Sequence, residues 1–299
     1  MRWRAARRGG PDPAARGAGK PGLEQSSGPG GRWFSGLGAA VALITALSVG
    51  ALVTVTPAAG AAGDLATGFA RAVRQLVSGS QTGRSFAGTP AVGALFTWSA
   101  GKLGSHFCTG SVVSSPQGDL VVTAAHCVSG LPDSSMAFVP GYNRGTAPYG
   151  VWTVTKAYTD HAWASSADPD DDVAFLQVSQ PGSIVPIQDV TGAEQLRTGT
   201  GARQLVDVIG YPDAADEPIA CRDWTSEPMA GQLEFDCGGY TDGTSGGPFL
   251  ADVDAATGQG TVIGVIGWYE QGGDTSDVSY SSMFGANVAS LYADAVAGL

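Results

Sequence analysis

Charged side chains are scarce in this chain of 299 residues, and it contains only three histidines. Lys, Arg, Asp and Glu together make up 14% of the sequence, whereas glycine alone contributes 45 residues. Long surface helices need many charged residues on their outer face, so this composition favours short strands joined by tight turns. The length suffices for one or two domains with a sizeable core.

Several chemical signatures are also missing. The four cysteines include no C-x-x-C spacing, so the closely spaced ligand pairs of a zinc site are absent. The sequence has no glycine-rich phosphate loop and no dinucleotide fingerprint. We interpret Asp168, Asp170 and Asp171 as a solvated acidic loop rather than a calcium loop. We therefore expect no metal and no cofactor.

Basic residues are concentrated at the start of the chain. The net charge is −11, yet residues 1–62 hold seven Lys or Arg against two Asp or Glu. Residues 63–299 therefore carry nine basic and twenty-five acidic side chains, a net charge of −16. An acidic body repels phosphate backbones, so we expect no binding to nucleic acid.

The N-terminal region has the layout of a secretory signal. Residues 1–32 are rich in Arg, Gly and Pro, a charge-free stretch runs from Leu37 to Val55, and small residues follow. We expect cleavage near Ala59–Ala62 and a secreted, extracellular protein. The apolar stretch of 19 residues is just long enough to cross a bilayer, so a retained membrane anchor is the alternative.

The remaining sequence divides into three further parts. After residues 1–62, we interpret residues 63–85 as a propeptide or an N-terminal brace, because apolar residues at helical spacing predict a short helix over 65–77. Short β-type runs bounded by Gly, Pro, Asp and Ser then predict an all-β fold of two packed six-stranded antiparallel Greek-key β-barrels, spanning 86–180 and 181–299. Apolar spacing in the tail predicts a C-terminal helix over 286–297. The expected strands are 91–98, 106–114, 119–124, 136–141, 150–157, 173–178, 204–210, 232–236, 247–252, 260–269 and 277–283.

Three segments carry the groups that a serine needs to hydrolyse a peptide bond. These groups are a base, a carboxylate that holds the base, and N–H donors for the oxyanion. His126 ends a Thr-Ala-Ala-His run, Asp172 begins Asp-Val-Ala-Phe-Leu, and Ser245 lies within Asp-Gly-Thr-Ser-Gly-Gly-Pro. Asp172 is preferred over its acidic neighbours because it alone adjoins the apolar run that begins at Val173.

The serine segment also matches G-x-S-x-G, the nucleophile elbow of α/β-hydrolases. In that fold the catalytic histidine follows the serine along the chain. Here His106, His126 and His161 all precede Ser245, so the elbow interpretation fails. We expect a structural role for His106 and a plain loop position for His161.

The three segments resemble the signature stretches of the chymotrypsin-like serine peptidase family, as does the His-Phe-Cys-Thr-Gly-Ser run over 106–111. The resemblance covers roughly residues 86–299, and bacterial secreted members look most similar. It implies that Ser245 attacks the carbonyl, His126 acts as general base and acid, and Asp172 orients the imidazole. The backbone N–H groups of Gly243 and Ser245 would form the oxyanion hole.

The resemblance also implies the cysteine pairing. Four cysteines allow three pairings. In the family the cysteine beside the histidine closes a disulfide, here between Cys127 and Cys108. That leaves Cys221 and Cys237 to pair with each other.

Further expectations concern the substrate. By resemblance, Gly267, Trp268 and Tyr269 match the strand that pairs with the substrate backbone, although an ordinary core strand ending in aromatics remains the alternative. Gly267 stands where the family has a serine that supports the catalytic aspartate. The floor of the primary pocket falls on Gly239, where a basic side chain would find no carboxylate. We therefore expect cleavage after a small or medium apolar residue.

Another departure from the family concerns activation. Activatable members carry an aspartate just before the nucleophile, and a freshly cut N-terminus pairs with it. Thr244 holds that position here. We therefore expect activity that needs no free α-amino group made by cutting after Arg84.

We expect a monomeric serine endopeptidase that acts on protein or peptide substrates. An esterase or acyltransferase on the same scaffold is one alternative, because acyl-enzyme chemistry is common to all of them. A catalytically silent homologue that serves as a binding module is the other alternative. Such a homologue usually lacks a member of the triad, and none is missing here.

Overall fold

The computed structural model describes residues 81–269, 273 and 275–299. The expected signal segment, its cleavage site and the helix over 65–77 lie outside the described residues. Within the described residues, no helix is both long and apolar enough to cross a membrane.

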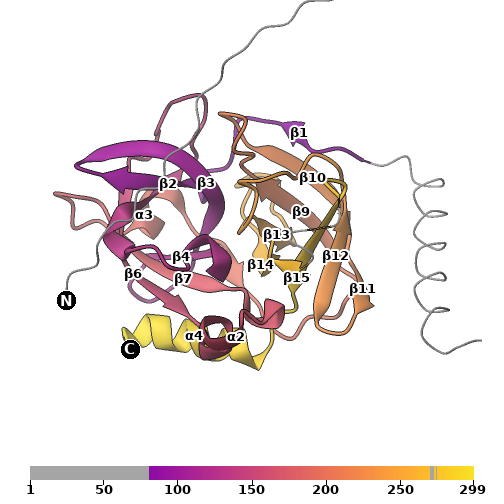
Figure 1. Cartoon of the computed structure of the whole chain (residues 1–299). Helices are drawn as coiled ribbons and strands as arrows, with labels where there is room; N and C mark the ends of the chain where they lie inside the picture. Colours follow the sequence, from indigo (N-terminus) through magenta and orange to yellow (C-terminus); the bar gives the residue numbers. More distant parts are fainter. Residues whose placement is uncertain (1–80, 270–272, 274) are drawn as a thin grey trace, which may run out of the picture. The chain divides into compact units, whose positions relative to one another are not determined.

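The first set of strands closes into a barrel in the order β2-β3-β4-β7-β6-β5, with every pair antiparallel (Figure 1). The β2–β3 hairpin turns through Ala100 and Gly101, which both have positive φ, the geometry that suits the twist of a two-residue hairpin. Leu95, Phe138 and Phe175 are fully buried inside the barrel core. The strands are β2 (Val92–Ser99), β3 (Lys102–Val113), β4 (Leu120–Thr123), β5 (Met136–Pro140), β6 (Trp152–Thr159) and β7 (Ala174–Ser179).

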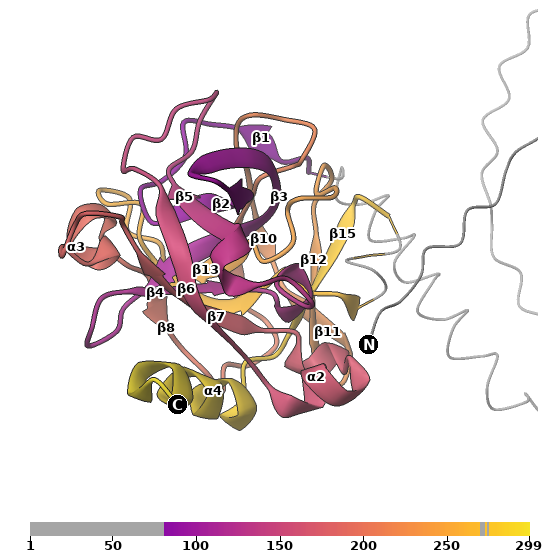
Figure 2. The ribbon, with the colours of Figure 1, turned by 60° about the vertical axis from the view of Figure 1, so that its left-hand side comes forward.

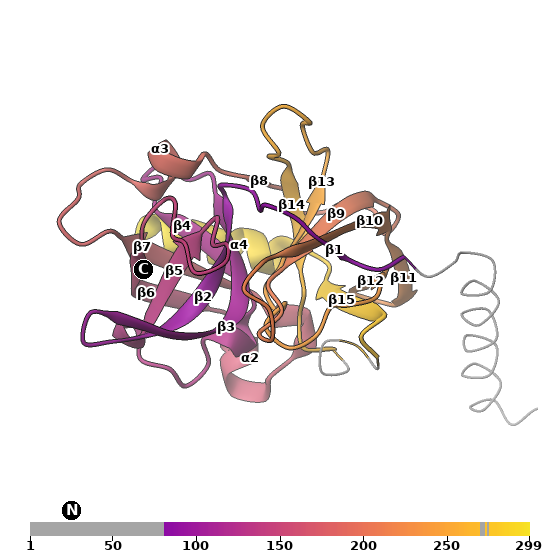
Figure 3. The same ribbon diagram turned by 90° about the horizontal axis from the view of Figure 1, so that it is seen from above.

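The second set of strands forms two sheets. One has the order β1-β10-β9-β13-β14-β8 and the other β11-β12-β15, and β1 lies along the edge of β10 (Figure 3). Their core contains Leu233, Phe235 and Phe249, all fully buried. The strands are β1 (Arg84–Ser85), β8 (Gln195–Leu196), β9 (Leu205–Gly210), β10 (Ile219–Trp224), β11 (Ser226–Met229), β12 (Gln232–Asp236), β13 (Pro248–Ala251), β14 (Thr261–Val265) and β15 (Val278–Ser282).

The expected all-β fold is confirmed, and every expected strand run overlaps an observed strand. Two details differ from the expectation. The second set of strands is divided between two sheets, and β8 pairs with β14 in parallel rather than antiparallel orientation. The parallel pair arises because β8 enters from the connection between the two halves, not from a hairpin.

Three α-helices accompany the described strands: α2 (His161–Ser166), α3 (Ile187–Thr191) and α4 (Ala286–Ala297). The predicted C-terminal helix is confirmed with the expected bounds. It packs against β6 and β7 of the first barrel (Figure 2), where Tyr292 meets Phe175 edge-on with ring centroids 5.6 Å apart. The Tyr292 hydroxyl also donates to the carbonyl of Ser114 at 2.7 Å. The C-terminal end of the chain thus completes the N-terminal barrel.

Two disulfides join strands to neighbouring segments. Cys108 of β3 is bonded to Cys127, and Cys221 of β10 is bonded to Cys237 just after β12. Both pairs are those implied by the family resemblance, so the pairing is confirmed.

Candidate active site

His126 and Asp172 meet through two hydrogen bonds. His126 lies in a short 3-10 turn (Ala125–Cys127) directly after β4, and its ring Nδ1 lies 2.7 Å from Asp172 Oδ2. The backbone N–H of His126 donates to the other oxygen, Oδ1, at 2.8 Å. Asp172 is 1% exposed, so this bidentate contact satisfies a carboxylate that has left water. The imidazole is therefore held in one orientation.

A 3-10 turn (Pro169–Asp171) presents Asp172, and β7 continues from it. The side chain of Asp168 caps this turn by accepting the N–H of Asp170. Asp171 accepts the backbone N–H of Val173 through its carbonyl at 2.8 Å. These local bonds hold the backbone on both sides of the carboxylate.

Side chains from the second half of the chain also contact this turn. Gln232 donates its amide N–H to Asp170 Oδ1 at 2.6 Å, and Asn287 donates to Asp171 Oδ1 at 2.7 Å. Asp170 is exposed and Asp171 is half-buried. The acidic loop before Asp172 is thus partly solvated and also holds the two halves together.

Ser245 follows β12 in a turn that packs against the first barrel. The Ser245 carbonyl accepts the N–H of Thr109 at 2.7 Å, and the Thr109 hydroxyl donates to the Gly243 carbonyl at 2.9 Å. The same hydroxyl accepts the N–H of Tyr211 at 2.9 Å, while the Thr109 carbonyl accepts the Thr123 hydroxyl at 2.7 Å. Thr109 is fully buried, so every polar group of this residue is bonded inside the protein.

The backbone of the Ser245 turn leaves two donors for a ligand. Gly243 has φ of +90°, and a Cβ there would lie 2.5 Å from the backbone nitrogen of Asp213 and 2.6 Å from the Tyr211 carbonyl oxygen. Only glycine fits this backbone. Among the described residues, no acceptor takes the N–H of Gly243 or of Ser245. Both groups are available to an oxyanion.

Gly267, Trp268 and Tyr269 follow β14, which ends at Val265. A Cβ on Gly267 would lie 3.4 Å from Asp172 Oδ2, so the position expected to support the aspartate does lie beside it. The ring of Trp268 is 5.3 Å from that of His126 and its side chain is 47% exposed, while Tyr269 packs edge-on against Tyr280. A half-exposed aromatic beside the imidazole suits a substrate surface better than an ordinary core strand.

Gly239 has φ of +95° and follows Gly238 in the segment between Cys237 and the Ser245 turn. A Cβ at Gly238 would lie 2.6 Å from Asp277 Oδ1, yet Asp277 itself is exposed. Asp277 thus lies beside Gly238 as a largely solvated residue.

The other two histidines lie outside the contact between His126 and Asp172, and His161 begins a helix instead of lying in the expected loop. His106 is buried among aromatic rings, 5.5 Å from Phe96 and 6.0 Å from Tyr142 between centroids. His161 is the exposed first residue of α2. The possible metal ligands that cluster in the described part of the chain are His126 with Cys108 and Cys127, whose sulfurs are already joined as a disulfide.

Thr109 is the residue that the sequence analysis missed. It follows Cys108 within the stretch that carries the family resemblance, but a threonine in a strand normally indicates only β propensity. The available signal was its position next to the cysteine bonded to Cys127, one residue from His126.

A comparison with protein families matches the model described as Trypsin to residues 85–284. The chain belongs to the trypsin family. Curated relatives include a trypsin from Sarcophaga bullata, 26% identical over 207 residues, covering 60% of this chain and 74% of that protein. Trypsin theta from Drosophila erecta is 27% identical over 194 residues, covering 56% of this chain and 68% of that protein. Family membership makes the chain a serine-type endopeptidase.

Solved structures of other serine proteases share the trypsin-family fold. The protease Anisep from Arthrobacter nicotinovorans superposes with a TM-score of 0.62 at 25% identity, covering 72% of this chain and all of that one. A thermostable serine protease from an extremophilic microorganism gives 0.60 at 24% identity, covering 71% and 99%.

Proposed function

We propose that this endopeptidase cleaves peptide bonds through an acyl-enzyme on Ser245. His126 takes the hydroxyl proton of Ser245 as it attacks the carbonyl, and later delivers that proton to the leaving amine. Asp172 keeps the imidazole in the required tautomer and stabilises the imidazolium without taking up the proton. The contact between His126 Nδ1 and Asp172 Oδ2, 2.7 Å long and buried on the aspartate side, is the observation that carries this assignment.

The N–H groups of Gly243 and Ser245 stabilise the oxyanion of the tetrahedral intermediate. Donors that are already oriented need no reorganisation when charge develops, which is why such groups contribute strongly to catalysis. The positive φ of Gly243 and the hydrogen bond from Thr109 to its carbonyl support this role.

The substrate lies along Gly267–Tyr269, with its primary side chain directed toward Gly239. This pocket takes a small or medium apolar side chain, because its floor residue carries no charge and Tyr269 narrows the entrance. The cysteine pairing supports an oxidising compartment, so the enzyme is secreted after removal of its N-terminal signal.

Labelling with a fluorophosphonate tests the nucleophile. The full chain is treated with the probe and its peptides are analysed by mass spectrometry. The label should fall on Ser245 alone, and Ser245→Ala should abolish both labelling and peptide cleavage. Labelling that survives in Ser245→Ala would overturn the assignment. Comparing matched amide and ester substrates separates a peptidase from an esterase, since a peptidase must turn over the amide.

A further inference from the structure

The segment just upstream of the family match makes specific contacts with the second half of the protein. In β1, Arg84 pairs with Ala220 and Ser85 with Ile219. Residues 81–83, which precede β1, pair through their backbone with Gly238 instead of β10. The N–H of Gly83 donates to the Gly238 carbonyl at 2.8 Å, and the N–H of Gly238 donates to the Gln81 carbonyl at 2.7 Å.

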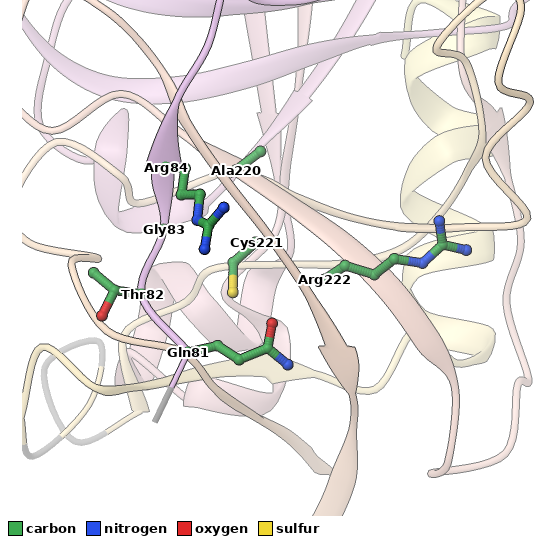
Figure 4. Close-up of a pocket in the computed structure, with 7 residues that line it drawn as sticks. All are labelled: Gln81, Thr82, Gly83, Arg84, Ala220, Cys221 and Arg222. Carbon is green, nitrogen blue, oxygen red and sulfur yellow. The ribbon is translucent and has the colours of Figure 1, made fainter. Parts of the chain in front are cut away.

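The course of this segment shows that it does more than extend the sheet. Past Ala220, a groove of about 800 Å³ separates residues 81–84 from Cys221 and Arg222 (Figure 4). The backbone hydrogen bonds of Gln81 and Gly83 described above join Gly238 rather than β10. The segment is thus anchored on β10 at one end and on Gly238 at the other.

Gly238 immediately precedes Gly239, the expected floor of the primary pocket. A Cβ built on Gly239 would lie 3.6 Å from Thr82 Cγ2, 3.7 Å from Ile219 Cδ1 and 3.9 Å from the nitrogen of Gly83. The space beside Gly239 is therefore occupied by Thr82, Gly83 and Ile219. Because Gly239 has positive φ and no side chain of its own, its position depends on such neighbours.

The preceding residue is held as well. Cys237 is tied to Cys221 of β10 by the disulfide, while Gly238 is bonded on both sides to Gln81 and Gly83. Gly83 itself has little room, since a Cβ there would lie 2.9 Å from Ile219 Cδ1. The disulfide and the upstream segment thus act together on the two residues before Gly239.

We propose that residues 81–83, here called the brace, position the floor of the primary pocket at Gly239 and belong to the active enzyme. This inference rests on the proposed function, because that proposal places Gly239 in the pocket. The brace touches no substrate. It acts through Gly238 and Gly239, so its residues are positioning residues rather than catalytic ones.

Two substitutions at one position of the full chain test the brace. Gly83→Pro adds a Cβ and removes the N–H that donates to Gly238. Gly83→Ala adds the same Cβ beside Ile219 but keeps the N–H, so it is the matched control. We expect Gly83→Pro to lower kcat/KM for a peptide with an apolar primary residue by at least about tenfold relative to Gly83→Ala.

Reaction with a small fluorophosphate distinguishes a defect in the primary pocket from a defect in the catalytic groups. Such a reagent needs Ser245, His126 and the oxyanion donors, but does not reach Gly239. We expect its inactivation rate to stay within about threefold between the two variants. Equal kcat/KM in both variants would overturn the proposed role of the brace. So would a loss of kcat/KM that is matched by an equal loss in the inactivation rate. A wild-type enzyme that neither cleaves peptides nor labels Ser245 would instead refute the proposed function.

Thr82→Ala provides a second test that leaves the backbone bonds in place, in case Gly83→Pro does not fold. It removes the Cγ2 atom beside Gly239, which gives the floor room to move. We expect the ratio of kcat/KM for a phenylalanine over an alanine primary residue to rise by about threefold or more. A ratio unchanged from that of the wild type would contradict the brace.

Discussion

The hydroxyl of Thr109 in the first barrel donates a 2.9 Å hydrogen bond to the carbonyl of Gly243, two residues before Ser245. The same hydroxyl accepts the N–H of Tyr211, so it joins two segments of the second half that flank the oxyanion donors. One buried side chain thereby connects the barrel that carries His126 with the turn that carries Ser245.

Replacing Thr109 by valine should lower kcat by about 10- to 100-fold with little change in KM, because misplaced oxyanion donors weaken binding of the transition state only. The buried N–H of Tyr211 and carbonyl of Gly243 would also lose their partner, at a cost of about 1–3 kcal/mol of unfolding free energy. Steady-state kinetics and denaturant unfolding measure both effects. Thr109→Ser keeps the hydroxyl and should remain within a few-fold of wild type in kcat. If the valine and serine variants have equal kcat, the hydroxyl does not position the donors.

Asp172→Asn should reduce kcat by about 10⁴-fold, the magnitude known for this substitution in a serine protease triad. An asparagine in the same place offers an N–H to one side, so the imidazole would be held in the wrong tautomer. Asp171→Asn, one residue earlier, alters the contact with Asn287 and should cost far less. Equal losses in the two variants, measured by steady-state kinetics, would argue against the role of Asp172.

Glu194 should make the protein less stable as pH rises from about 4.5 to 7. Its carboxyl is buried in the connection between the two halves, where it accepts the N–H of Gly260, and burial raises its pKa from 4.5 to about 7. The folded state favours the protonated carboxyl over the ionised one. The contribution of Glu194 to the free energy of unfolding is therefore complete below pH 4.5 and is lost as the pH approaches 7. This interval corresponds to about 3 kcal/mol of unfolding free energy.

Glu194→Gln removes that titration. Denaturant unfolding should therefore show that the unfolding free energy of the variant, relative to that of the wild type, is higher at pH 8 than at pH 5. Asp294→Asn, an exposed change on α4, is the control and should follow wild type at both values. A constant difference between Glu194→Gln and wild type across this range would show that Glu194 ionises normally in the folded protein.

Arg84→Gln should leave peptidase activity within about twofold of wild type. The substitution blocks any tryptic cut before Ser85. In the uncut chain Ser85 is already paired with Ile219 in β1. The Thr244 hydroxyl, at the position of the family's activation aspartate, already donates to the Thr241 carbonyl at 2.7 Å. No new α-amino group is needed there. Loss of activity in Arg84→Gln, with the uncut chain confirmed by N-terminal sequencing, would show that cleavage activates the enzyme.

Peptide-library profiling should show a preference for small or medium apolar residues over arginine at the primary position. Gly239 supplies no carboxylate, and Asp277 beside Gly238 is exposed. A tenfold preference for Arg over Leu or Ala in kcat/KM, about 1.4 kcal/mol, would contradict this pocket. Asp277→Asn is the companion variant and should leave the profile unchanged, because Asp277 is exposed. A changed profile would show that its carboxylate contributes to the pocket.

Much of the fold was predictable because its strands alternate with strong turn signals. The β4 and β7 runs are mostly apolar, and the α4 residues Val288 and Leu291 recur at helical spacing and are buried as expected. The strands β1, β8, β10 and β11 were missed. Their polar sequences, such as Arg84–Ser85 and Ser226–Met229, form strands through tertiary pairing rather than intrinsic preference.

The residues of the candidate site were likewise predictable only in part. His126 and Asp172 stand in runs with distinctive neighbours, and the structure brings them together although they are 46 residues apart. Thr109 and Gln81 contribute mainly backbone or hydroxyl bonds to segments more than 100 residues away. Such contacts leave no periodic pattern in a single sequence, so only the folded arrangement reveals them.

The packing of α4 against β6 and β7 has a consequence for the strand that follows Asp172. α4 follows every described strand along the sequence, yet it packs on the barrel whose strands come earlier. Removing residues 286–297 would take the Tyr292 ring away from Phe175 and uncover the β6–β7 face of that barrel. The strand that continues from Asp172 therefore depends for part of its packing on a segment made after Ser245.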